Sequence, residues 1–541
     1  MDVPRRRLEG AIQMLYDDDV DGTAEWVLKQ CRHHVLCRFR SSSSLQLRNQ
    51  IDDVGIGRVM IRGFPPKPVF CAATSSAVKM GKRRKQRKAA VDRDVISSLP
   101  DEILCHILSF LPTRTSMATS VLSRRWRYLW EKVQVLDLND DFLYTHDRSD
   151  EEAEECFINF LEKVVSGFNP LRKVRLSCRA DDYGYRRLFE WIGSVSEGVR
   201  ELYFSTRTTN RMTYTLHFEY IYSTSLVSLV LDGNINIIFD DVNLDGKLFL
   251  PSLKNLELHI DYLNLDVFLS GCPALETLRV TLIKFTTREA DFDLEAIHMP
   301  RTLKSLTFEE RYHYSEVVTL KRLQLDTPSL EYLHLELRCD YKRILVCDYT
   351  NIKKACLDIW PKRRNVAWVP KLLGALCKTK FLWLKVSTIQ CLLPAPVLDI
   401  PDFCNLIQLQ LDFEDFKAKL LIDLLHHCPK LQALKIYVLG SLDGEDYFYL
   451  SYLNPHKRNG WRQPSSVPNC IVSHLNTVEY RGYQNTPEEH EFTAYILQRG
   501  LVLKTMRIHA KYYCPHYLKW EISQALSEIQ RGSNMCRLEI D

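Results

Sequence analysis

Residues 95–130 read VISSLPDEILCHILSFLPTRTSMATSVLSRRWRYLW, and this stretch contains three short helix signals. The first helix is predicted to begin with Pro100 at its first position, where a missing N–H is harmless, and the acids that follow favour the positive end of the helix dipole. Apolar residues then recur at helical spacing as far as Leu111. Pro112 cannot continue the helix, so the sequence predicts its end there.

A second and a third short helix are predicted to complete this unit. Residues 113–120 are rich in small and hydroxyl side chains, and Ser120 or Ser123 is expected to cap a helix that carries Trp126 and Trp130. A unit of about 36 residues encloses too little volume to bury all of this apolar surface. Part of the surface is therefore expected to contact a partner.

The order of these residues resembles an F-box, through LPDEIL at 99–104, ILSFLP at 107–112 and SVLSRRW at 120–126. The resemblance implies a module that binds the Skp-type adaptor, and through it the cullin, of a ubiquitin ligase. The alternative is a helical hairpin that caps a larger domain. The side chains to which the resemblance assigns adaptor binding are Leu99, Pro100, Ile103, Leu104, Ile107, Leu108, Leu111, Pro112, Leu122 and Trp126.

Length and composition limit the other possibilities. The chain has 541 residues, too many for one compact core, with 45% hydrophobic and 26% charged residues and a net charge of +4. This balance points to neither a membrane nor a nucleic-acid partner. The 17 cysteines form no Cys-x-x-Cys pair and are expected to be reduced thiols in the nucleus and/or cytoplasm. We find no apolar run long enough for a membrane helix and no signal-peptide pattern.

After the F-box-like unit, apolar residues recur at positions 1, 4 and 6 of a short phrase. Its eleven copies lie about 22 to 29 residues apart, which is the leucine-rich-repeat period. The copies are Leu171/Val174/Leu176, Val199/Leu202/Phe204, Leu226/Leu229/Leu231, Leu253/Leu256/Leu258, Leu275/Leu278/Val280, Leu303/Leu306/Phe308, Leu330/Leu333/Leu335, Ile352/Ala355/Leu357, Phe381/Leu384/Val386, Leu406/Leu409/Leu411 and Leu431/Leu434/Ile436.

A single repeat cannot bury its own apolar side, so the copies are predicted to stack into a curved solenoid with one continuous core. Short helices are expected at 265–269 and 420–427. Side chains that alternate with the buried ones would form a concave surface for a protein substrate, although each could simply be solvated. These substrate-binding candidates are Arg175, Tyr203, Glu257, His259, Arg279, His334, Glu336, Lys385, Gln410, Asp412 and Tyr437.

Beyond residue 460 the repeat period persists, but the sequence changes. WRQPSSVPNC at 461–470, the phrase Leu475/Val478/Tyr480 and the acidic run 488–491 resemble the FBD segment of plant proteins that also carry an F-box and leucine-rich repeats. Over residues 92–541 the order of segments resembles that plant family. The resemblance leaves the role of the FBD open: a cap over the last core edge, with a helix at 520–529 and a last strand at Leu538 and Ile540, or a separate recognition site.

The predicted fold class is α/β: a small helical F-box at 92–138, a curved leucine-rich-repeat solenoid at 139–460, and an FBD region with a terminal cap at 461–541. Residues 1–90 form an extension with a basic cluster at 82–88, which suggests a nuclear import signal, a nucleic-acid contact or a solvated linker. Met80 is an alternative start of the chain. The charged run 147–155 is expected to be an exposed linker.

The sequence therefore predicts a non-catalytic substrate receptor of an SCF-type ubiquitin ligase, in which alanine at Leu99 and Pro100 would abolish adaptor binding. The alternatives are a leucine-rich-repeat scaffold that acts outside a ligase and a receptor completed by a small molecule. No phosphate loop, His-Glu-x-x-His helix or nucleophile elbow is present. No cofactor and no metal are expected, because the sets Cys31/His33/His34/Cys37 and His426/His427/Cys428 lack further ligands.

Overall fold

The structure is a computed structural model, and it divides into two compact units, residues 1–138 with 167–171 and residues 139–166 with 172–541. The N-terminal extension, its basic cluster, Met80 and the set Cys31/His33/His34/Cys37 lie outside the described residues. The described residues are 96, 99–141, 143, 149–167, 170–179, 185–196, 198–206, 214–217, 222–233, 235–238, 250–260, 262–263, 265–282, 297–311, 319–338, 340–360, 368–393, 400–439, 461, 463–511 and 516–541.

In the first unit two α-helices are followed by short 3₁₀ turns. Pro100 is the N-cap of the first helix rather than its first residue, so the predicted start was one residue early. The predicted third α-helix is wrong, because separate 3₁₀ turns take its place and bury Trp126 and Leu129. The elements are α5 (Asp101–Leu108), α6 (Thr113–Ala118), η2 (Thr119–Val121), η3 (Trp126–Tyr128), η4 (Trp130–Lys132) and β1 (Val135–Asn139).

The core of this unit joins α5 to the 3₁₀ turns. Six side chains, each exposed by 4% or less, form one cluster: Leu104, Leu108, Leu111, Trp126, Leu129 and Val133. The Ser116 hydroxyl donates to the carbonyl of Leu108 at 3.0 Å and so holds α6 against the end of α5. The unit thus fills its interior with a few large side chains and leaves other apolar residues outside.

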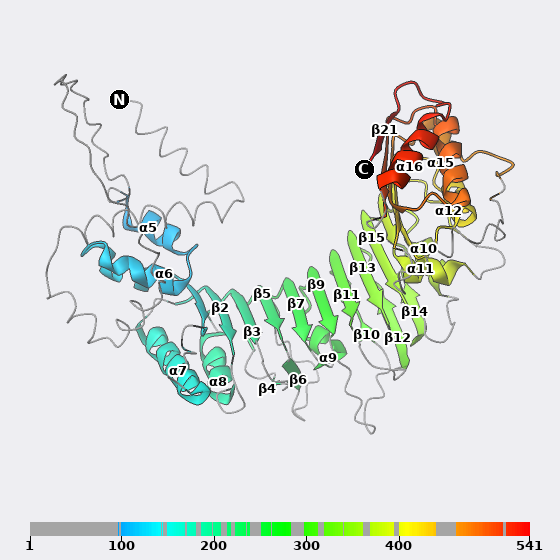
Figure 1. The fold of residues 1–541 in the computed structure, drawn as a ribbon. Helices are drawn as coiled ribbons and strands as arrows, with labels where there is room; N and C mark the ends of the chain where they lie inside the picture. Colours follow the sequence, from blue (N-terminus) through cyan, green and yellow to red (C-terminus); the bar gives the residue numbers. More distant parts are fainter. Residues whose placement is uncertain are drawn as a thin grey trace, which may run out of the picture. The chain divides into compact units, whose positions relative to one another are not determined.

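The second unit is built on one parallel sheet in the order β2-β3-β5-β7-β9-β11-β13-β15-β16-β17-β18-β19-β20-β21, which confirms the stacked repeats (Figure 1). Within a strand, buried apolar residues alternate with more exposed ones, and equivalent positions pair across strands, as Leu306 does with Leu278 and Leu333. The strands are β2 (Lys173–Cys178), β3 (Glu201–Thr206), β5 (Ser228–Asp232), β7 (Asn255–Ile260), β9 (Thr277–Leu282), β11 (Ser305–Glu310), β13 (Tyr332–Leu337), β15 (Lys354–Ile359), β16 (Phe381–Leu384), β17 (Gln408–Phe413), β18 (Ala433–Val438), β19 (Thr477–Tyr483), β20 (Thr505–Ala510) and β21 (Arg537–Ile540).

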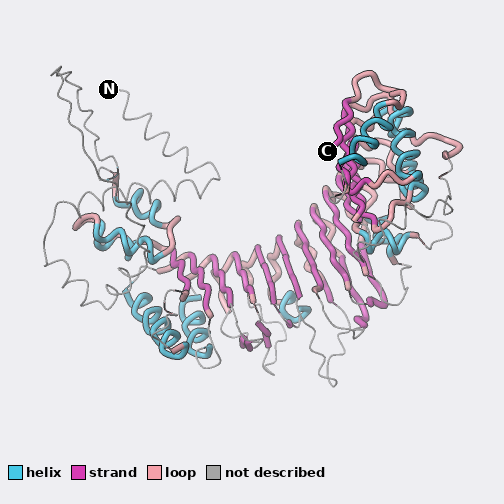
Figure 2. The backbone as a smooth tube through the Cα atoms, in the orientation of Figure 1, coloured by secondary structure: helices cyan, strands magenta, loops and turns pink. Residues whose placement is uncertain are grey.

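Each repeat returns through a helix, a short strand or a loop, as the tube in Figure 2 shows. Two small parallel sheets accompany the main one, β4 (Tyr214–His217) with β6 (Ile235–Ile238) and β8 (Tyr262–Leu263), and β10 (Ile297–His298) with β12 (Thr319–Leu325) and β14 (Asp340–Val346). The remaining helices are α7 (Asp150–Gly167), α8 (Tyr185–Ser196), α9 (Leu265–Ser270), α10 (Val369–Ala375), α11 (Val386–Leu392), α12 (Ala418–His426), α14 (Asn469–Ser473), α15 (Pro487–Arg499) and α16 (His516–Ser527).

Four of the predicted helices and linkers can be compared directly with these bounds. The helices α9 and α12 confirm the two that were expected to complete repeats. The charged run at 147–155 is not simply a linker, because residues from Asp150 onward form α7, where acids suit the first turn. The terminal helix α16 begins four residues before the predicted Trp520 and ends two residues before Ile529.

One predicted repeat copy, Phe381/Leu384/Val386, is shifted by two residues. In the sheet Leu382 pairs with Ala355 and Leu384 with Leu357, so the copy in register is Thr379/Leu382/Leu384. A threonine at position 1 hid this copy, and its buried hydroxyl is satisfied because it donates to the carbonyl of Phe381 at 2.9 Å.

The FBD-like region, residues 461–541, continues the same sheet. Tyr480 and Ile508 pair across β19 and β20, in line with the leucines of earlier repeats. Among the described strands β21 pairs with β20 alone, and its Leu538 and Ile540 remain half-buried. The region therefore supplies further repeats of the solenoid.

Candidate functional site

The first candidate surface lies around α5 in the F-box unit. Pro100 and Pro112 are exposed at the two ends of the helical stretch, and the Ile103 side chain between them is 37% exposed although it is apolar. Three further predicted adaptor contacts, Leu99, Ile107 and Leu122, are only partly buried and pack against the unit's core. These six residues are available to a partner to different degrees.

The other four predicted contacts lie inside the unit. Leu104 and Leu108 are fully buried, and Leu111 and Trp126 are each 4% exposed. In this conformation they support the surface from below and cannot touch a partner, since opening the unit would expose its whole core. The resemblance names positions but does not separate those that carry the surface from those that form it.

Sequence reasoning missed two exposed apolar side chains in this unit. Val121 at the end of η2 is 51% exposed, and Tyr128 at the end of η3 is 57% exposed. The surplus of apolar residues predicted such a surface, but the sequence did not show which side chains form it. The 3₁₀ turns leave Val121 and Tyr128 in solvent while Trp126 points inward.

An ion-pair cluster fixes the beginning of α5. The Arg125 guanidinium lies 2.8 Å and the Lys132 ammonium 3.2 Å from carboxylate oxygens of Asp101, and Arg125 also donates to the carbonyl of Leu99. The hydrogen bonds from Arg125 and Lys132 lower the pKa of Asp101. The segment that carries Pro100 and Ile103 is thereby tied to the 3₁₀ turns by charge as well as by packing.

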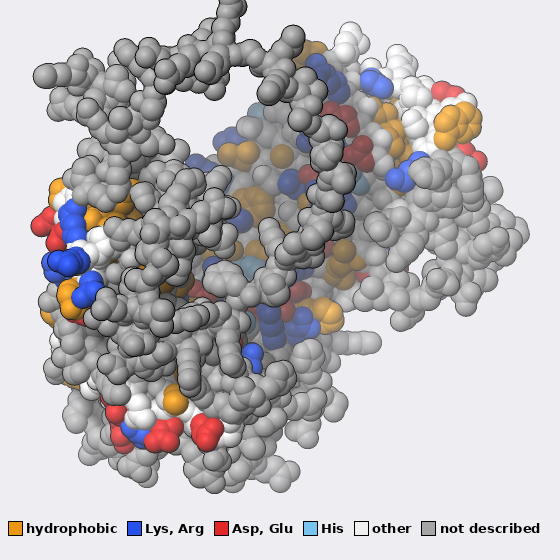
Figure 3. Space-filling model, turned by 60° about the vertical axis from the view of Figure 1, so that its left-hand side comes forward, with side chains coloured by type: hydrophobic (Ala, Val, Ile, Leu, Met, Phe, Trp, Pro, Cys, Tyr) orange, Lys and Arg blue, Asp and Glu red, His pale blue; other side chains and the backbone are white. Residues whose placement is uncertain are grey.

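The second candidate surface is the polar face of the main sheet, formed by the first, third and fifth residues of the strands. All eleven predicted substrate contacts lie on this face, where charged side chains of both signs alternate with apolar ones (Figure 3). Third-position residues are Arg175, Tyr203, Glu257, Arg279, His334 and Gln410, and fifth-position residues are His259, Glu336, Asp412 and Tyr437, while Lys385 directly follows the short strand β16. Their contact with a substrate stays a prediction.

The structure brings several of these residues together in pairs. The Arg175 guanidinium lies 5.3 Å from the centre of the Tyr203 ring on the next strand. Arg279 and Glu257 are neighbours whose charged atoms lie 3.6 Å apart. These are the more exposed members of the face, so a partner can reach them without moving the sheet.

A denser cluster occupies the fifth positions of β13, β15 and the segment after β16. Lys385 Nζ lies 3.3 Å from Asp358 Oδ2 and 3.8 Å from Glu336 Oε2. Asp358 Oδ1 also accepts hydrogen bonds from the Trp360 indole and the Ser387 hydroxyl, both at 2.7 Å. Burial alone would lower the pKa of Lys385, but the charges of Asp358 and Glu336 outweigh it and raise that pKa.

The cluster continues onto β17 through an indole. Trp383 Nε1 donates to Asp412 Oδ2 at 2.9 Å, and burial raises the pKa of Asp412. On the other side, burial lowers the pKa of His334, whose Nε2 is enclosed without a hydrogen-bond partner and lies 3.9 Å from Glu309 Oε1. The arrangement is a pre-ordered set of charges and indoles.

Three of the predicted contacts in this cluster face the expected side but are hardly accessible. Glu336 is 8% exposed, and Gln410 and Asp412 are each 7% exposed, because neighbouring long side chains cover them. Alternation along a strand predicts which face a residue takes but not whether its neighbours cover it. A substrate would meet Lys385 and Trp383 before these three.

Sequence reasoning missed Asp358, Trp360 and Trp383. The alternation with the buried Ala355 and Leu357 could have placed Asp358 on the polar face, but that copy of the repeat is degraded. Trp383 was missed because it lies in the copy whose predicted register was shifted by two residues. Trp360, 45% exposed, follows β15 and stacks with Arg338 at 4.7 Å from its ring centre. A register shared by all strands was needed to find these residues.

Neither a metal site nor a membrane segment is found in the described part of the chain. No group of three or more His, Cys, Asp or Glu side chains is placed to hold an ion among the residues described. In the set His426/His427/Cys428, His427 Nδ1 instead lies 2.8 Å from Asp402, and burial raises the pKa of Cys428. None of the described helices combines the length and the apolar character needed to cross a bilayer.

Comparisons with known proteins agree with this architecture. The F-box domain family matches residues 96–138, and the FBD family matches residues 463–508. An F-box/FBD/LRR-repeat protein of Arabidopsis thaliana is 29% identical over 408 residues, which cover 72% of this chain and 86% of the relative. An F-box/LRR-repeat protein of the same plant is 32% identical over 361 residues, 63% of this chain and 72% of the relative. An FBD-associated F-box protein of that plant is 28% identical over 485 residues, 83% and 99% of the two chains.

A helical F-box unit and a long parallel sheet of stacked repeats define the class as an F-box protein with leucine-rich repeats. The shared FBD segment narrows the class further. The chain belongs to the plant F-box/leucine-rich-repeat/FBD family.

Proposed function

We propose that this chain is the substrate-recognition subunit of an SCF-type cullin-RING ubiquitin ligase. The F-box unit binds the Skp-type adaptor, which links the chain to the cullin, and the polar face of the sheet binds a protein substrate for ubiquitination. The chain itself performs no chemistry. The presence of an F-box and the adaptor character of F-box/LRR proteins in general support this proposal.

The observation that carries the proposal is an excess of exposed apolar side chains on a unit whose core is already filled. Ile103, Val121 and Tyr128 are between 37% and 57% exposed, while the six core residues below them are exposed by 4% or less. Large apolar side chains that a small unit leaves in solvent are candidates for a protein interface. Buried anchors of such an interface often contribute about 2 kcal/mol or more each.

With the structure, a more selective variant than the Leu99/Pro100 double alanine can be chosen to test adaptor binding. Leu99 packs against the core, so its truncation would disturb the unit itself. Ile103→Ala removes an exposed side chain instead. Ile407→Ala is a matched control, because Ile407 is also exposed, by 39% compared with 37% for Ile103, but lies in the second unit.

Affinity for a purified Skp-type adaptor can be measured by calorimetry, with thermal unfolding as the check on folding. We expect Ile103→Ala to weaken binding by about 30-fold, the equivalent of about 2 kcal/mol, and Ile407→Ala to leave it unchanged. Full adaptor affinity in a folded Ile103→Ala/Tyr128→Ala variant would refute the docking surface. The chain would then be better described as a leucine-rich-repeat scaffold outside a ligase.

A further inference from the structure

A row of side chains runs along the N-terminal edge of the main sheet. We call it the edge row: it consists of the residue directly before each strand. Backbone hydrogen bonds join its members in order, since the N–H of Arg200 donates to the carbonyl of Arg172 at 2.8 Å, that of Val227 to Arg200 at 2.8 Å and that of Lys254 to Val227 at 2.9 Å. The row therefore places side chains from distant parts of the sequence about 4.8 Å apart, the spacing of adjacent strands.

Along the middle of the edge row, charges of opposite sign alternate and neutralise one another. Glu276 lies between Lys254 and Lys304, at 3.1 and 2.7 Å from their ammonium groups. Glu331 pairs with Lys353 at 2.6 Å. These two carboxylates compensate the lysines beside them, so this part of the row offers little net charge to a ligand.

The beginning of the row lacks such compensation. Arg172 and Arg200 are adjacent and exposed, and neither has an ion-pair partner among the described residues. The carboxylate next to Arg200 in the chain, Glu201, pairs instead with Lys173 at 2.9 Å. Two cationic residues at paired positions of adjacent strands repel each other unless an anion lies nearby.

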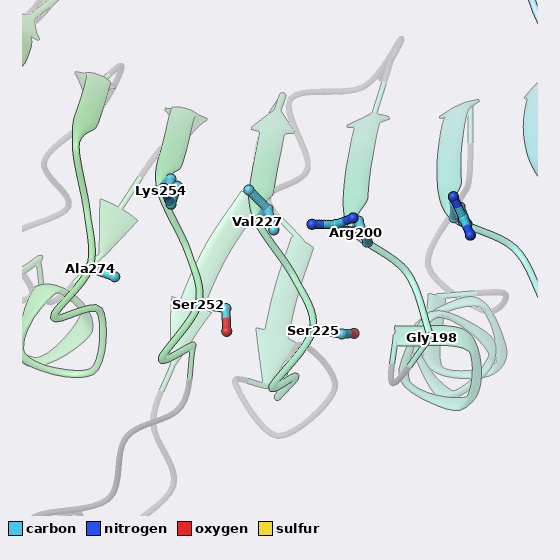
Figure 4. A pocket seen from close by; sticks show the side chains of 8 residues that line it. Gly198, Arg200, Ser225, Val227, Ser252, Lys254 and Ala274 are labelled. Carbon is cyan, nitrogen blue, oxygen red and sulfur yellow. The ribbon is translucent and has the colours of Figure 1, made fainter.

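A cavity of about 590 Å³ opens at this uncompensated part of the row. Its charged lining is Arg172, Arg200 and Lys254, and in Figure 4 the Arg200 side chain extends toward Val227. Val227, which carries no charge, stands between Arg200 and Lys254 in the row.

Small residues form the rest of the cavity wall. Gly198, Ser225, Ser252 and Ala274 line it and leave room for a main chain to approach (Figure 4). Ser225 donates its hydroxyl to the carbonyl of Val199 at 3.1 Å, while the Ser252 hydroxyl has no hydrogen-bond partner within the described part of the chain. The cavity thus combines cations, a hydroxyl donor and space.

We propose that this cavity binds an extended, acidic segment of a protein partner, at a site separate from the polar face of the sheet. Arginine forks bind carboxylate or phosphate oxygens with two parallel hydrogen bonds. In an extended peptide, side chains two residues apart point the same way about 6.6 Å apart, which lies between one and two strand spacings. Asp, Glu or phosphoserine residues at alternate positions can therefore engage Arg172 and Arg200, while Lys254, which already pairs with Glu276, borders the site.

The lining favours a peptide over a nucleic acid. Single-stranded nucleic acids bind through cationic grooves whose aromatic side chains stack on the bases. The lining here contains Gly, Ala, Val and Ser residues and no aromatic side chain. The chain's net charge of +4 is also too small to hold a polyanion by charge alone.

The test uses the full-length protein and three fluorescein-labelled peptides, Gly-Ser-Gly-X-Gly-X-Gly-Ser-Gly, in which X is phosphoserine, glutamate or serine. Fluorescence anisotropy gives the dissociation constants at 0.1 M salt. The cavity variant is Arg172→Gln/Arg200→Gln, which keeps the aliphatic stems. The matched control is Lys380→Gln/Lys504→Gln, which removes the same charge from exposed members of the edge row for which no ion pair is found among the described residues.

We expect one or both anionic peptides to bind, the serine peptide not to bind, and the cavity variant to lose at least about tenfold in affinity while the control loses less than about twofold. Binding of the phosphoserine peptide alone would identify a phosphorylated partner, and binding of both would identify an acidic one. Equal losses in the two variants, or no binding of either anionic peptide, would overturn the proposal. A labelled 12-nucleotide oligouridine that binds more tightly than both peptides would also overturn it, in favour of nucleic acid.

Discussion

The carboxylate of Glu489 is the buried polar centre of the FBD-like region, and its removal is a sharp test of how this region is held together. It is 1% exposed and lies at the third position of α15. Its Oε1 accepts from the Tyr480 hydroxyl at 2.8 Å, and its Oε2 accepts from the N–H groups of Thr486 and Gln484 at 2.9 and 3.2 Å and from the Thr486 hydroxyl at 3.0 Å. We expect Glu489→Ala to destabilise this region strongly.

The magnitude follows from the donors left without an acceptor. The Tyr480 side chain is fully buried, and a buried donor without a partner costs about 1–3 kcal/mol. Loss of the capping box between Thr486 and Glu489 removes about 1 kcal/mol more. Burial raises the pKa of Glu489, which means that the ionised carboxylate is destabilised by its surroundings in the folded protein. Removing this carboxylate therefore offsets part of the destabilisation that the lost hydrogen bonds cause. The two losses sum to about 2–4 kcal/mol, and the net destabilisation lies in the lower part of that range.

Hydrogen exchange followed by mass spectrometry is the suitable assay, because a repeat array does not unfold in one step and exchange reports each segment separately. We expect faster exchange in β19 and α15 of Glu489→Ala and unchanged exchange in β2 and β3. Glu489→Gln is the control, since its oxygen can still accept from Thr486 and Gln484 while its amide donates to the Tyr480 hydroxyl. Equal effects of Ala and Gln, or unchanged exchange in the Ala variant, would refute the reasoning.

The same carboxyl gives a pH dependence of defined sign. Because burial raises the pKa of Glu489 above its ordinary 4.5, the folded protein binds this proton more tightly than the unfolded chain does. The resulting stabilisation is fully present below pH 4.5 and is lost as the pH rises through the folded-state pKa. Exchange protection of β19, corrected for intrinsic rates, should therefore fall over that window in the wild type and not in Glu489→Gln. The same pH profile in both proteins would contradict the assignment.

Three further predictions follow from individual side chains. Gly482→Ala should lower the thermal midpoint, because Gly482 has φ +80° and a Cβ would lie 2.0 Å from the carbonyl oxygen of Val438, a strain of about 1–3 kcal/mol; an unchanged midpoint would contradict it. The NMR titration midpoint of His334 should lie below 6.5, because burial lowers its pKa. Any stability linked to this group is therefore present above pH 6.5 and lost as the pH falls through the folded-state pKa. A midpoint above 6.5 would be inconsistent with the enclosed ring. Iodoacetamide should modify the exposed Cys404 well before Cys272, whose pKa burial raises to about 12. The order is measured by mass spectrometry of the alkylated peptides. The reverse order would indicate that the repeat core is open.

The face that each repeat residue takes could be predicted from the sequence because alternation in a strand has a period of two. The shifted copy at Phe381 shows how robust this rule is: an error of two residues leaves Lys385 on the same face. The cluster around Asp358 could not be predicted in the same way. Its contacts join residues between 2 and 49 positions apart, and the longer ones depend on a register that degraded copies obscure.

The F-box unit shows a different limit. Apolar periodicity located α5 to within a few residues, although the helix ends at Leu108 rather than at Pro112. It cannot say which apolar side chains remain outside when their number exceeds what the core holds. Leu104 and Ile103 are adjacent and equally apolar, yet one is fully buried and the other is 37% exposed. Leu104 is the one that packs in the cluster with Trp126 and Leu129, whose positions in the 3₁₀ turns the sequence did not predict.

The polar face and the edge row differ in what they can contribute to binding. On the polar face, Lys385 is already neutralised by Asp358 and Glu336, so a partner that pairs with it must first displace an existing ion pair and gains little net charge attraction. Such a surface discriminates by shape and by the positions of its indoles. Arg172 and Arg200 carry no such partners within the described chain, and an uncompensated charge pair accelerates the approach of an anion over a longer range. If one partner used both surfaces, its association rate should fall steeply with added salt through the edge row, while its dissociation rate would be set by the polar face.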